Sequence, residues 1–154
     1  MHLQITTDYA IRMIGYLAQH KEQLVTARNM AGELGITYQY SMKVINQLKK
    51  ANLIDSVQGC NGGYRLTEEA ALATFYDIIC LMEGDIYLNR CVGEGKFCKR
   101  GPTELCEIHR VLQDLQNELI IGLQSKKVVD VWTREKPNKP ATVTPIDDEL
   151  SQTG

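Results

Sequence analysis

Hydrophobic residues recur every three to four positions through most of the chain, which is the spacing of amphipathic helices. The first such stretch has Ala10 and Ile14 on one face and a cap at Thr6 or Thr7. Two shorter helical stretches follow, joined by a brief connection at Gly35. Glycine supplies the backbone freedom of a tight turn between helices. The pattern therefore predicts a helix-turn-helix.

The period of the pattern changes after the third helical stretch. Residues Leu53–Val57 and Tyr64–Leu66 suit two short strands, and the glycine-rich segment Gln58–Gly63 suits the hairpin between them. A helix-turn-helix followed by such a hairpin is a winged helix-turn-helix.

The rest of the chain predicts a fourth helix from Thr74 to Gly84, a loop with few core-forming residues, and a long amphipathic helix from Thr103. Three of the four prolines follow it. We therefore expect a mainly α protein with four parts: a winged helix-turn-helix DNA-binding region (1–84), a cysteine-bearing loop (85–102), a long C-terminal dimerisation helix with its extension (103–132), and a disordered tail (133–154).

The charge is unevenly divided between these parts. The formal net charge is −2, but residues 1–66 carry seven basic and four acidic side chains, which leaves +3 there and −5 in the remainder. A basic winged-helix half favours binding to double-stranded DNA, with the third helix in a major groove. The candidate DNA contacts are Tyr38, Gln39, Tyr40, Ser41, Lys43 and Gln47 on that helix, Asn61 and Arg65 on the hairpin, and Arg12 on the first helix.

The long helix predicts a homodimer. Its hydrophobic residues are spaced 3-4-3-4 from Leu105 to Leu119, and so small a chain has little core to cover them. A second copy would cover this seam and present two recognition helices to a palindromic operator. The alternative is that the helix packs on its own domain.

Three of the five cysteines flank and cross the predicted loop. Cys91, Cys98 and Cys106 are spaced C-x6-C-x7-C, and His109 follows three residues later. Wide-set thiolates with one non-thiolate ligand suit an iron–sulfur cluster with one labile position. Structural zinc and three unrelated reduced thiols are the alternatives. The other two cysteines differ: we expect an exposed thiol at Cys60 in the hairpin and a packing role for Cys80.

No apolar run approaches the ~18 residues of a membrane helix, and the N-terminus has no secretory pattern. We therefore expect a cytoplasmic protein with no membrane partner.

Four features together resemble the Rrf-type winged-helix transcriptional regulators of bacteria, which include the iron–sulfur regulators NsrR and IscR. They are MHLQITTDYAIRMIGYLA, MKVINQLKKANLI, GCNGGYRL, and the three-cysteine loop before a long helix. The resemblance implies a homodimeric regulator, usually a repressor, with a cluster near the dimer interface that senses nitric oxide, iron–sulfur status or redox state.

The same resemblance offers two fourth ligands. Thr7-Asp8-Tyr9 matches a motif whose aspartate, from the other subunit, completes a 4Fe–4S cluster. Cys106-Glu107-Ile108-His109 matches one whose histidine completes a 2Fe–2S cluster. We favour Asp8 and 4Fe–4S, because TTDYAIR matches over a longer stretch. The cysteine intervals of six and seven exceed the five common in these subfamilies, and Gln58 stands where many relatives have arginine.

Two rival functions remain. The first is a winged-helix regulator without a cluster, controlled by thiol oxidation, zinc or a partner protein. The second is a small metal enzyme or electron carrier, but no nucleophile–base set is visible in the sequence, so we expect no enzyme.

Overall fold

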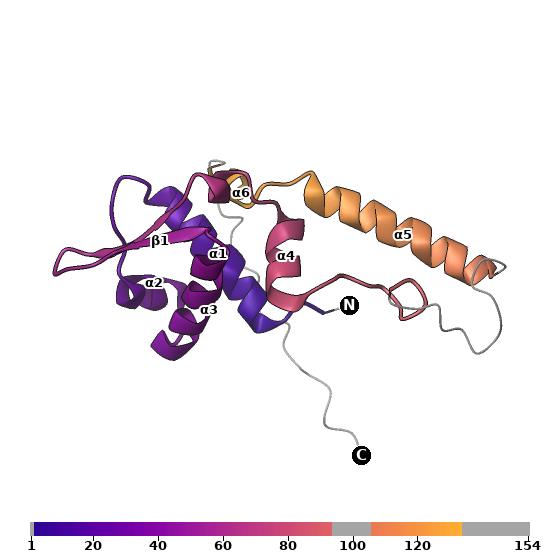
Figure 1. The fold of residues 1–154 in the computed structure, drawn as a ribbon, viewed down its shortest axis with the longest axis horizontal. Coiled ribbons are helices and arrows are strands. Elements are labelled where there is room, and N and C mark those ends of the chain that lie inside the picture. Colours follow the sequence, from indigo (N-terminus) through magenta and orange to yellow (C-terminus); the bar gives the residue numbers. More distant parts are fainter. Residues whose placement is uncertain (1, 94–105, 134–154) are drawn as a thin grey trace, which may run out of the picture.

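The computed structural model describes residues 2–93 and 106–133. Over these residues the chain is mainly helical (Figure 1). The elements in chain order are α1 (Ile5–Gln19), α2 (Ala27–Leu34), α3 (Tyr38–Lys50), β1 (Ile54–Val57), β2 (Gly63–Leu66), a 3-10 turn η1 (Glu69–Ala71), α4 (Phe75–Glu83), α5 (Glu107–Gln124) and α6 (Val128–Thr133). The predicted mainly α, winged helix-turn-helix class is confirmed.

Local signals fix the helix-turn-helix. The Thr26 hydroxyl accepts a hydrogen bond from the backbone N–H of Asn29 at 3.2 Å and so caps α2. Gly35 ends α2 in the left-handed conformation, with φ of 66°, which glycine adopts without steric cost. Thr37 then caps α3 by accepting from the N–H of Tyr40 at 3.4 Å. The two helices are thus joined by a turn with little freedom.

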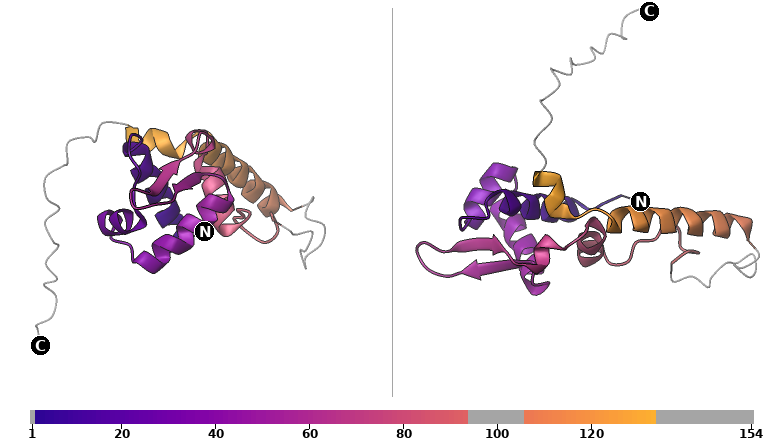
Figure 2. Two further views of the ribbon diagram at one scale, coloured as in Figure 1. Left: turned by 60° about the vertical axis from the view of Figure 1, so that its left-hand side comes forward. Right: turned by 90° about the horizontal axis from the view of Figure 1, so that it is seen from above.

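The wing is an antiparallel pair in which Ile54 lies opposite Leu66 and Asp55 opposite Arg65. An isolated bridge between Val25 and Tyr64 ties the base of the hairpin to the segment before α2. The hairpin and α5 project from opposite ends of the body (Figure 2).

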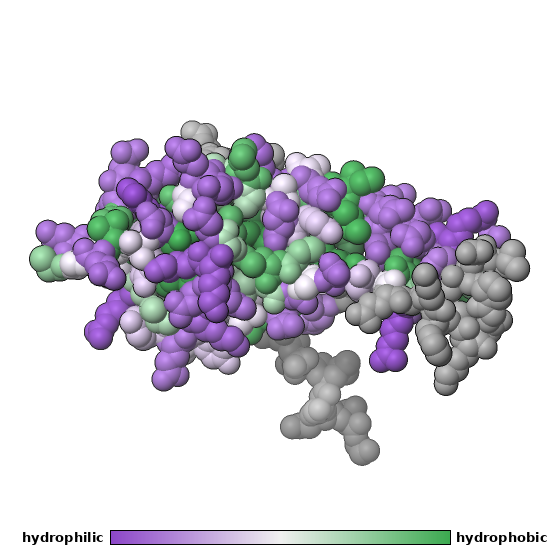
Figure 3. All heavy atoms as spheres, viewed as in Figure 1, coloured by the Kyte–Doolittle hydropathy of each residue, from purple (hydrophilic) through white to green (hydrophobic). Residues whose placement is uncertain are grey.

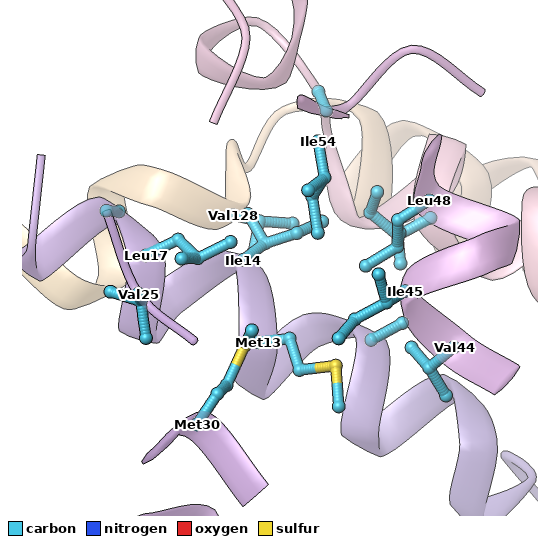
Figure 4. Close-up of a cluster of buried hydrophobic side chains, with 14 of the residues drawn as sticks. Met13, Ile14, Leu17, Val25, Met30, Val44, Ile45, Leu48, Ile54 and Val128 are labelled. Carbon is cyan, nitrogen blue, oxygen red and sulfur yellow. The ribbon is translucent and has the colours of Figure 1, made fainter. Parts of the chain in front are cut away.

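Helix α1 runs through the centre of the core. Its residues Met13, Ile14 and Leu17 are at most 2% exposed. Figure 4 shows side chains from several elements converging on them. These partners come from α2, α3, β1 and α6, and include Met30, Val44, Ile45, Leu48, Ile54 and Val128. Burial of each large apolar side chain contributes about 1.5–3 kcal/mol, so this cluster holds α3 against the rest of the fold.

Helix α5 extends away from this core (Figures 1 and 2). Ile108, Val111, Leu115 and Ile121 are 66%, 54%, 48% and 65% exposed, respectively. In Figure 3 hydrophilic residues cover much of the helix-turn-helix end, while hydrophobic residues reach the surface between that end and α5. Ile108 and Leu115 belong to the predicted seam, Leu112 and Leu119 of that seam are half-buried, and Val111 and Ile121 lie outside it. A single protomer therefore leaves an apolar part of α5 uncovered that includes two residues of the predicted seam.

Helix α6 returns the chain to α1. Val128 and Val129 are buried, and a methyl group at Gly15 would overlap the Trp132 ring. The sequence predicted only an extension of the long helix here. Residue 133 belongs to α6 rather than to the predicted tail, and the rest of that tail lies outside the described residues.

The start of α1 also differs from expectation. The helix begins at Ile5, so Thr7 lies inside it and is fully buried instead of acting as a cap. No helix among the described residues is long and apolar enough to span a membrane.

Candidate nucleic-acid interface and cysteine-bearing loop

One face of α3 packs on the core and leaves the opposite face to solvent. Gln39 and Lys43 are exposed, and Tyr38 and Tyr40 are 50% and 48% exposed. These four side chains are the predicted contacts that the structure places on the open face. They combine hydrogen-bonding groups, aromatic surface and one positive charge, which suits contact with bases and phosphates.

Ser41 does not belong to this surface. It is fully buried, and its hydroxyl donates to the backbone oxygen of Thr37 at 3.1 Å. The prediction that it faces outward is wrong. Its sequence position shows why: Ser41 precedes Val44 by three residues and Leu48 by seven, so it lies on their face.

Gln47 is half-buried rather than fully outward. Its Oε1 atom is buried and has no hydrogen-bond partner among the described residues. An unpartnered buried amide oxygen is costly, and a ligand or rearrangement that supplies a donor would relieve that cost.

The wing brings Asn61 to an exposed position at its tip. Arg65 lies on the outer face of β2, where its guanidinium pairs with the Asp55 carboxylate at 3.2 Å. Arg12 on α1 is similarly paired with Asp8, at 2.7 Å. Both arginines stay more than half exposed, at 57% and 52%, so a phosphate can still reach them, although a neighbouring carboxylate offsets each charge.

The cysteine region is described at its two ends. Cys91 is a half-buried free thiol in the turn after α4, and Cys106 is a half-buried free thiol at the N-cap of α5. Cys98 lies outside the described residues. Within residues 2–93 and 106–133, no three side chains of the metal-ligating types come together.

The Cys91 turn is anchored on α5 by a residue that sequence analysis missed. Gln116 is 5% exposed, and its side-chain oxygen accepts from the backbone N–H of Leu88 at 3.0 Å. Ile86 and Val92 are also buried. The signal was a glutamine among the apolar positions of an amphipathic helix.

The two candidate fourth ligands differ in burial and in hydrogen bonding. His109 is half-buried, and its Nδ1 atom is buried without a hydrogen-bond partner among the described residues. It lies one turn beyond Cys106, where side chains on a helix are neighbours. Asp8 is 44% exposed and already holds Arg12.

The remaining two cysteines are separate from this region. Cys60 is exposed at the wing tip, as predicted, and Cys80 is half-buried on α4. The pKa of the Tyr76 phenol is raised above its usual value, first by a hydrogen bond with Cys80 and then by the charge of that sulfur. Cys80 therefore has a polar neighbour as well as the packing role that the sequence predicts.

Comparison with known proteins gives a consistent family. The model of the family described as "Rrf2: Iron-dependent Transcriptional regulator" matches residues 3–134. The HTH-type transcriptional regulator NsrR of Bacillus licheniformis is 32% identical over 133 residues, covering 85% of this chain and 92% of that protein. NsrR of Shouchella clausii is 30% identical over 137 residues, covering 88% and 91%. The solved structure of T. potens IscR superposes with a TM-score of 0.66 at 26% identity and covers 85% of each chain.

Proposed function

This chain belongs to the Rrf2 family of transcriptional regulators, and from that premise we propose that it is a homodimeric repressor whose operator affinity is controlled by an iron–sulfur cluster. Members of this family are DNA-binding regulators, not enzymes, so the enzyme hypothesis is set aside. The open face of α3 and the wing are the surfaces that we assign to a palindromic duplex operator in the cytoplasm.

One observation carries the cluster assignment. Cys91 and Cys106 are free, half-buried thiols at the two ends of the segment that contains Cys98, and the buried Nδ1 of His109 lacks a partner one turn beyond Cys106. Thiolates and imidazole are the donor types that iron–sulfur clusters use. The donor set therefore fits the cluster, with Cys91, Cys98 and Cys106 as the proposed thiolate ligands.

The geometry changes our preference for the fourth ligand. Ligation by His109 would relieve an unpartnered buried nitrogen, which costs about 1–3 kcal/mol. Ligation by Asp8 of the partner subunit would break an exposed Asp8–Arg12 pair, which is worth only about 0.3–0.5 kcal/mol. The small cost of breaking the Asp8–Arg12 pair does not exclude Asp8 as a ligand. Only His109, however, has an unpartnered buried nitrogen that ligation would satisfy. We therefore place His109 first, with a 2Fe–2S cluster, and Asp8 with 4Fe–4S second.

When bound, the cluster would supply a centre sensitive to nitric oxide, oxidants or iron–sulfur status. The protein's own residues would hold the ligands and transmit changes in their positions. Gln116 holds the Cys91 turn against α5, and α5 carries Cys106 and His109. A change in how these ligands are held would therefore shift the turn relative to α5.

Two contacts connect α4, which precedes the Cys91 turn, with α3 by way of α1. Glu83 at the end of α4 accepts a hydrogen bond from the Thr7 hydroxyl on α1 at 2.6 Å. Tyr9, two residues further along α1, contacts Tyr40 on the recognition helix. These residues form a path by which the loop could bias the position of α3.

A second copy of the chain is the proposed cover for α5. The exposed residues Ile108, Val111, Leu115 and Ile121 lie along one long helix, and burying them against their counterparts would remove this surface from water. Two recognition helices would then be presented to the two half-sites of the operator.

The experiment is anaerobic purification with iron, sulfide and zinc analysis, visible and resonance Raman spectra, and operator binding before and after cluster removal. We expect a coloured protein whose absorption is lost in Cys106→Ala and retained in Cys80→Ala, the matched control. His109→Ala should change the Raman bands of the cluster more than Asp8→Ala does.

A colourless protein with no iron or sulfide after anaerobic reconstitution would overturn the cluster proposal. Zinc in its place, or operator affinity that follows thiol oxidation alone, would support the regulator without a cluster.

A further inference from the structure

An open cleft of about 490 Å³ lies between the start of α2, the first residue of α3 and the wing. Its walls include Arg28, Tyr38, Lys49 and Gln58, and none of the described residues that line it is acidic. The cleft borders the exposed face of α3 through Tyr38, which lines it and stands on that face. It is therefore a cationic recess beside the proposed DNA surface.

Arg28 lies over the ring of Tyr38 at this cleft. Its guanidinium carbon is 5.9 Å from the centroid of the Tyr38 ring, a cation–π arrangement. A cation–π contact of this kind favours this placement of the guanidinium and leaves its N–H donors free to bind an anion. A guanidinium whose N–H groups are free suits phosphate binding, because its planar donors match the phosphate oxygens.

The charge of Arg28 is also unopposed. Residues 1–66 contain three arginines, of which Arg12 and Arg65 each pair with an aspartate. In the described ranges Arg28 forms no ion pair, and its side chain is exposed. The arginine that sequence analysis did not single out therefore offers the least neutralised positive charge of the three.

Other groups at the cleft are also positively charged or partially positive. The Lys49 ammonium donates to the neutral Ser56 hydroxyl at 2.6 Å, and no carboxylate among the described residues pairs with it. Ala27 and Arg28 line the cleft as the first residues of α2, where backbone N–H groups lack intrahelical acceptors and carry partial positive charge.

We propose that this cleft binds a phosphodiester group of the operator backbone, with Arg28 as the phosphate ligand and Tyr38 as the residue that positions it. The inference rests on the proposed function, which supplies duplex DNA as the partner. A phosphate contact fixes the register of a protein on DNA without reading sequence. Arg28 would thus set where α3 enters the groove.

The test measures binding of the full-length protein to operator and to random duplex across salt concentrations. Arg28→Ala should weaken both by a similar factor, about tenfold for each Arg28–phosphate contact and so about a hundredfold in a dimer, because a charge-assisted contact is lost without any base contact. The slope of log affinity against log salt should fall by about 0.9 for each Arg28–phosphate contact, and by about twice that in a dimer. Arg110→Ala on α5 removes the same charge and should leave the slope unchanged.

A second arm locates the phosphate. Methylphosphonate substitution, one position at a time, should reveal a phosphate whose neutralisation weakens the wild type but not Arg28→Ala. Tyr38→Leu should reduce the effect at that same position while the net charge stays constant. Inorganic phosphate added at fixed ionic strength should compete weakly if the cleft is specific for the DNA backbone.

Three results would overturn the assignment. Wild-type affinity and salt slope in Arg28→Ala would exclude a phosphate contact. Weakened binding to the operator alone would make Arg28 a base-reading residue, and strong competition by free phosphate would make the cleft a small-anion site. If the wild type bound no duplex at all, the proposed function would fail together with this inference. Unchanged thermal unfolding of the variants separates each result from misfolding.

Discussion

Tyr9 on α1 meets Tyr40 on the recognition helix edge to face, with ring centroids 6.3 Å apart and ring planes at 72°. Tyr9 follows Asp8, one of the two candidate fourth ligands, and Tyr40 is half-exposed on the proposed DNA surface. Besides the core packing of α1 on α3, an aromatic contact therefore joins the segment that contains Asp8 to the helix assigned to DNA.

Replacing Tyr9 by leucine should destabilise the contact without emptying the core. A double-mutant cycle of Tyr9→Leu and Tyr40→Leu, measured by urea unfolding, should give a coupling of about 0.5–1.5 kcal/mol. The Tyr9→Leu variant should also narrow the difference in operator affinity between holo and apo protein. A coupling indistinguishable from zero would remove this contact from the path.

Thr7 anchors the start of α1 to the end of α4. Its buried hydroxyl donates to Glu83 Oε1 at 2.6 Å, and the backbone N–H of Gln4 donates to the same oxygen at 2.8 Å. Thr7→Val keeps the shape but removes one charge-assisted hydrogen bond, and should cost about 1–3 kcal/mol of unfolding free energy. Thr6→Val, at a less buried neighbouring position with no hydrogen bond to Glu83, should cost less than half as much by the same urea titration.

Gly15 allows α6 to pack on α1. A methyl group there would overlap the Trp132 ring, so Gly15→Ala should displace α6 and cost about 1–3 kcal/mol. The chain has one tryptophan, so its fluorescence reports this displacement directly, as a shift of emission to longer wavelength.

Gly32→Ala is the matched control. Gly32 lies within α2 with open space around its Cα, so alanine there should stabilise the helix by up to about 1 kcal/mol and leave the emission unchanged. Equal behaviour of the two variants would mean that Gly15 matters only through helix propensity.

The fold was largely predictable because its signals are local. The caps at Thr26 and Thr37, the turn glycine Gly35 and the hairpin between two short strands each follow from a few adjacent residues. The position of α6 was not predictable, because it depends on the fit of Trp132 against Gly15, more than a hundred residues away in sequence.

Sequence alone indicates the residue types of the site but not their contacts. Cys91 and Cys106 are free, half-buried thiols, and their role as ligands stays a prediction. The state of each arginine depends instead on neighbours across the fold, such as Asp55 opposite Arg65 and Tyr38 beside Arg28. The prediction fails for Ser41 because a polar side chain alone suggests an exposed position, whereas its helical phase puts it on the buried face with Val44 and Leu48.

Lys43 is exposed on α3 whereas Ser41 is buried, so substitutions at these two positions should have different effects. Lys43→Ala removes an exposed positive charge and should weaken operator binding and reduce its salt dependence. Ser41→Ala removes a buried hydroxyl and should leave DNA affinity unchanged while costing about 0.5–1.5 kcal/mol of stability. Anisotropy titrations and urea unfolding of both variants check this. A Ser41→Ala variant with weakened binding and full stability would return Ser41 to the DNA surface.

Gln116 provides the last test, because it holds the Cys91 turn without being a candidate ligand. Gln116→Leu leaves the Leu88 N–H without its acceptor in a buried position, at a cost of about 1–3 kcal/mol. The turn should open more often, and alkylation of Cys91 in the apo protein, followed by mass spectrometry, should accelerate about 5- to 150-fold as that cost implies. Gln113→Leu, one turn earlier and bonded only to Asn117 at the surface, should leave the rate at the wild-type value. Equal rates in the two variants would show that Gln116 does not hold the turn closed.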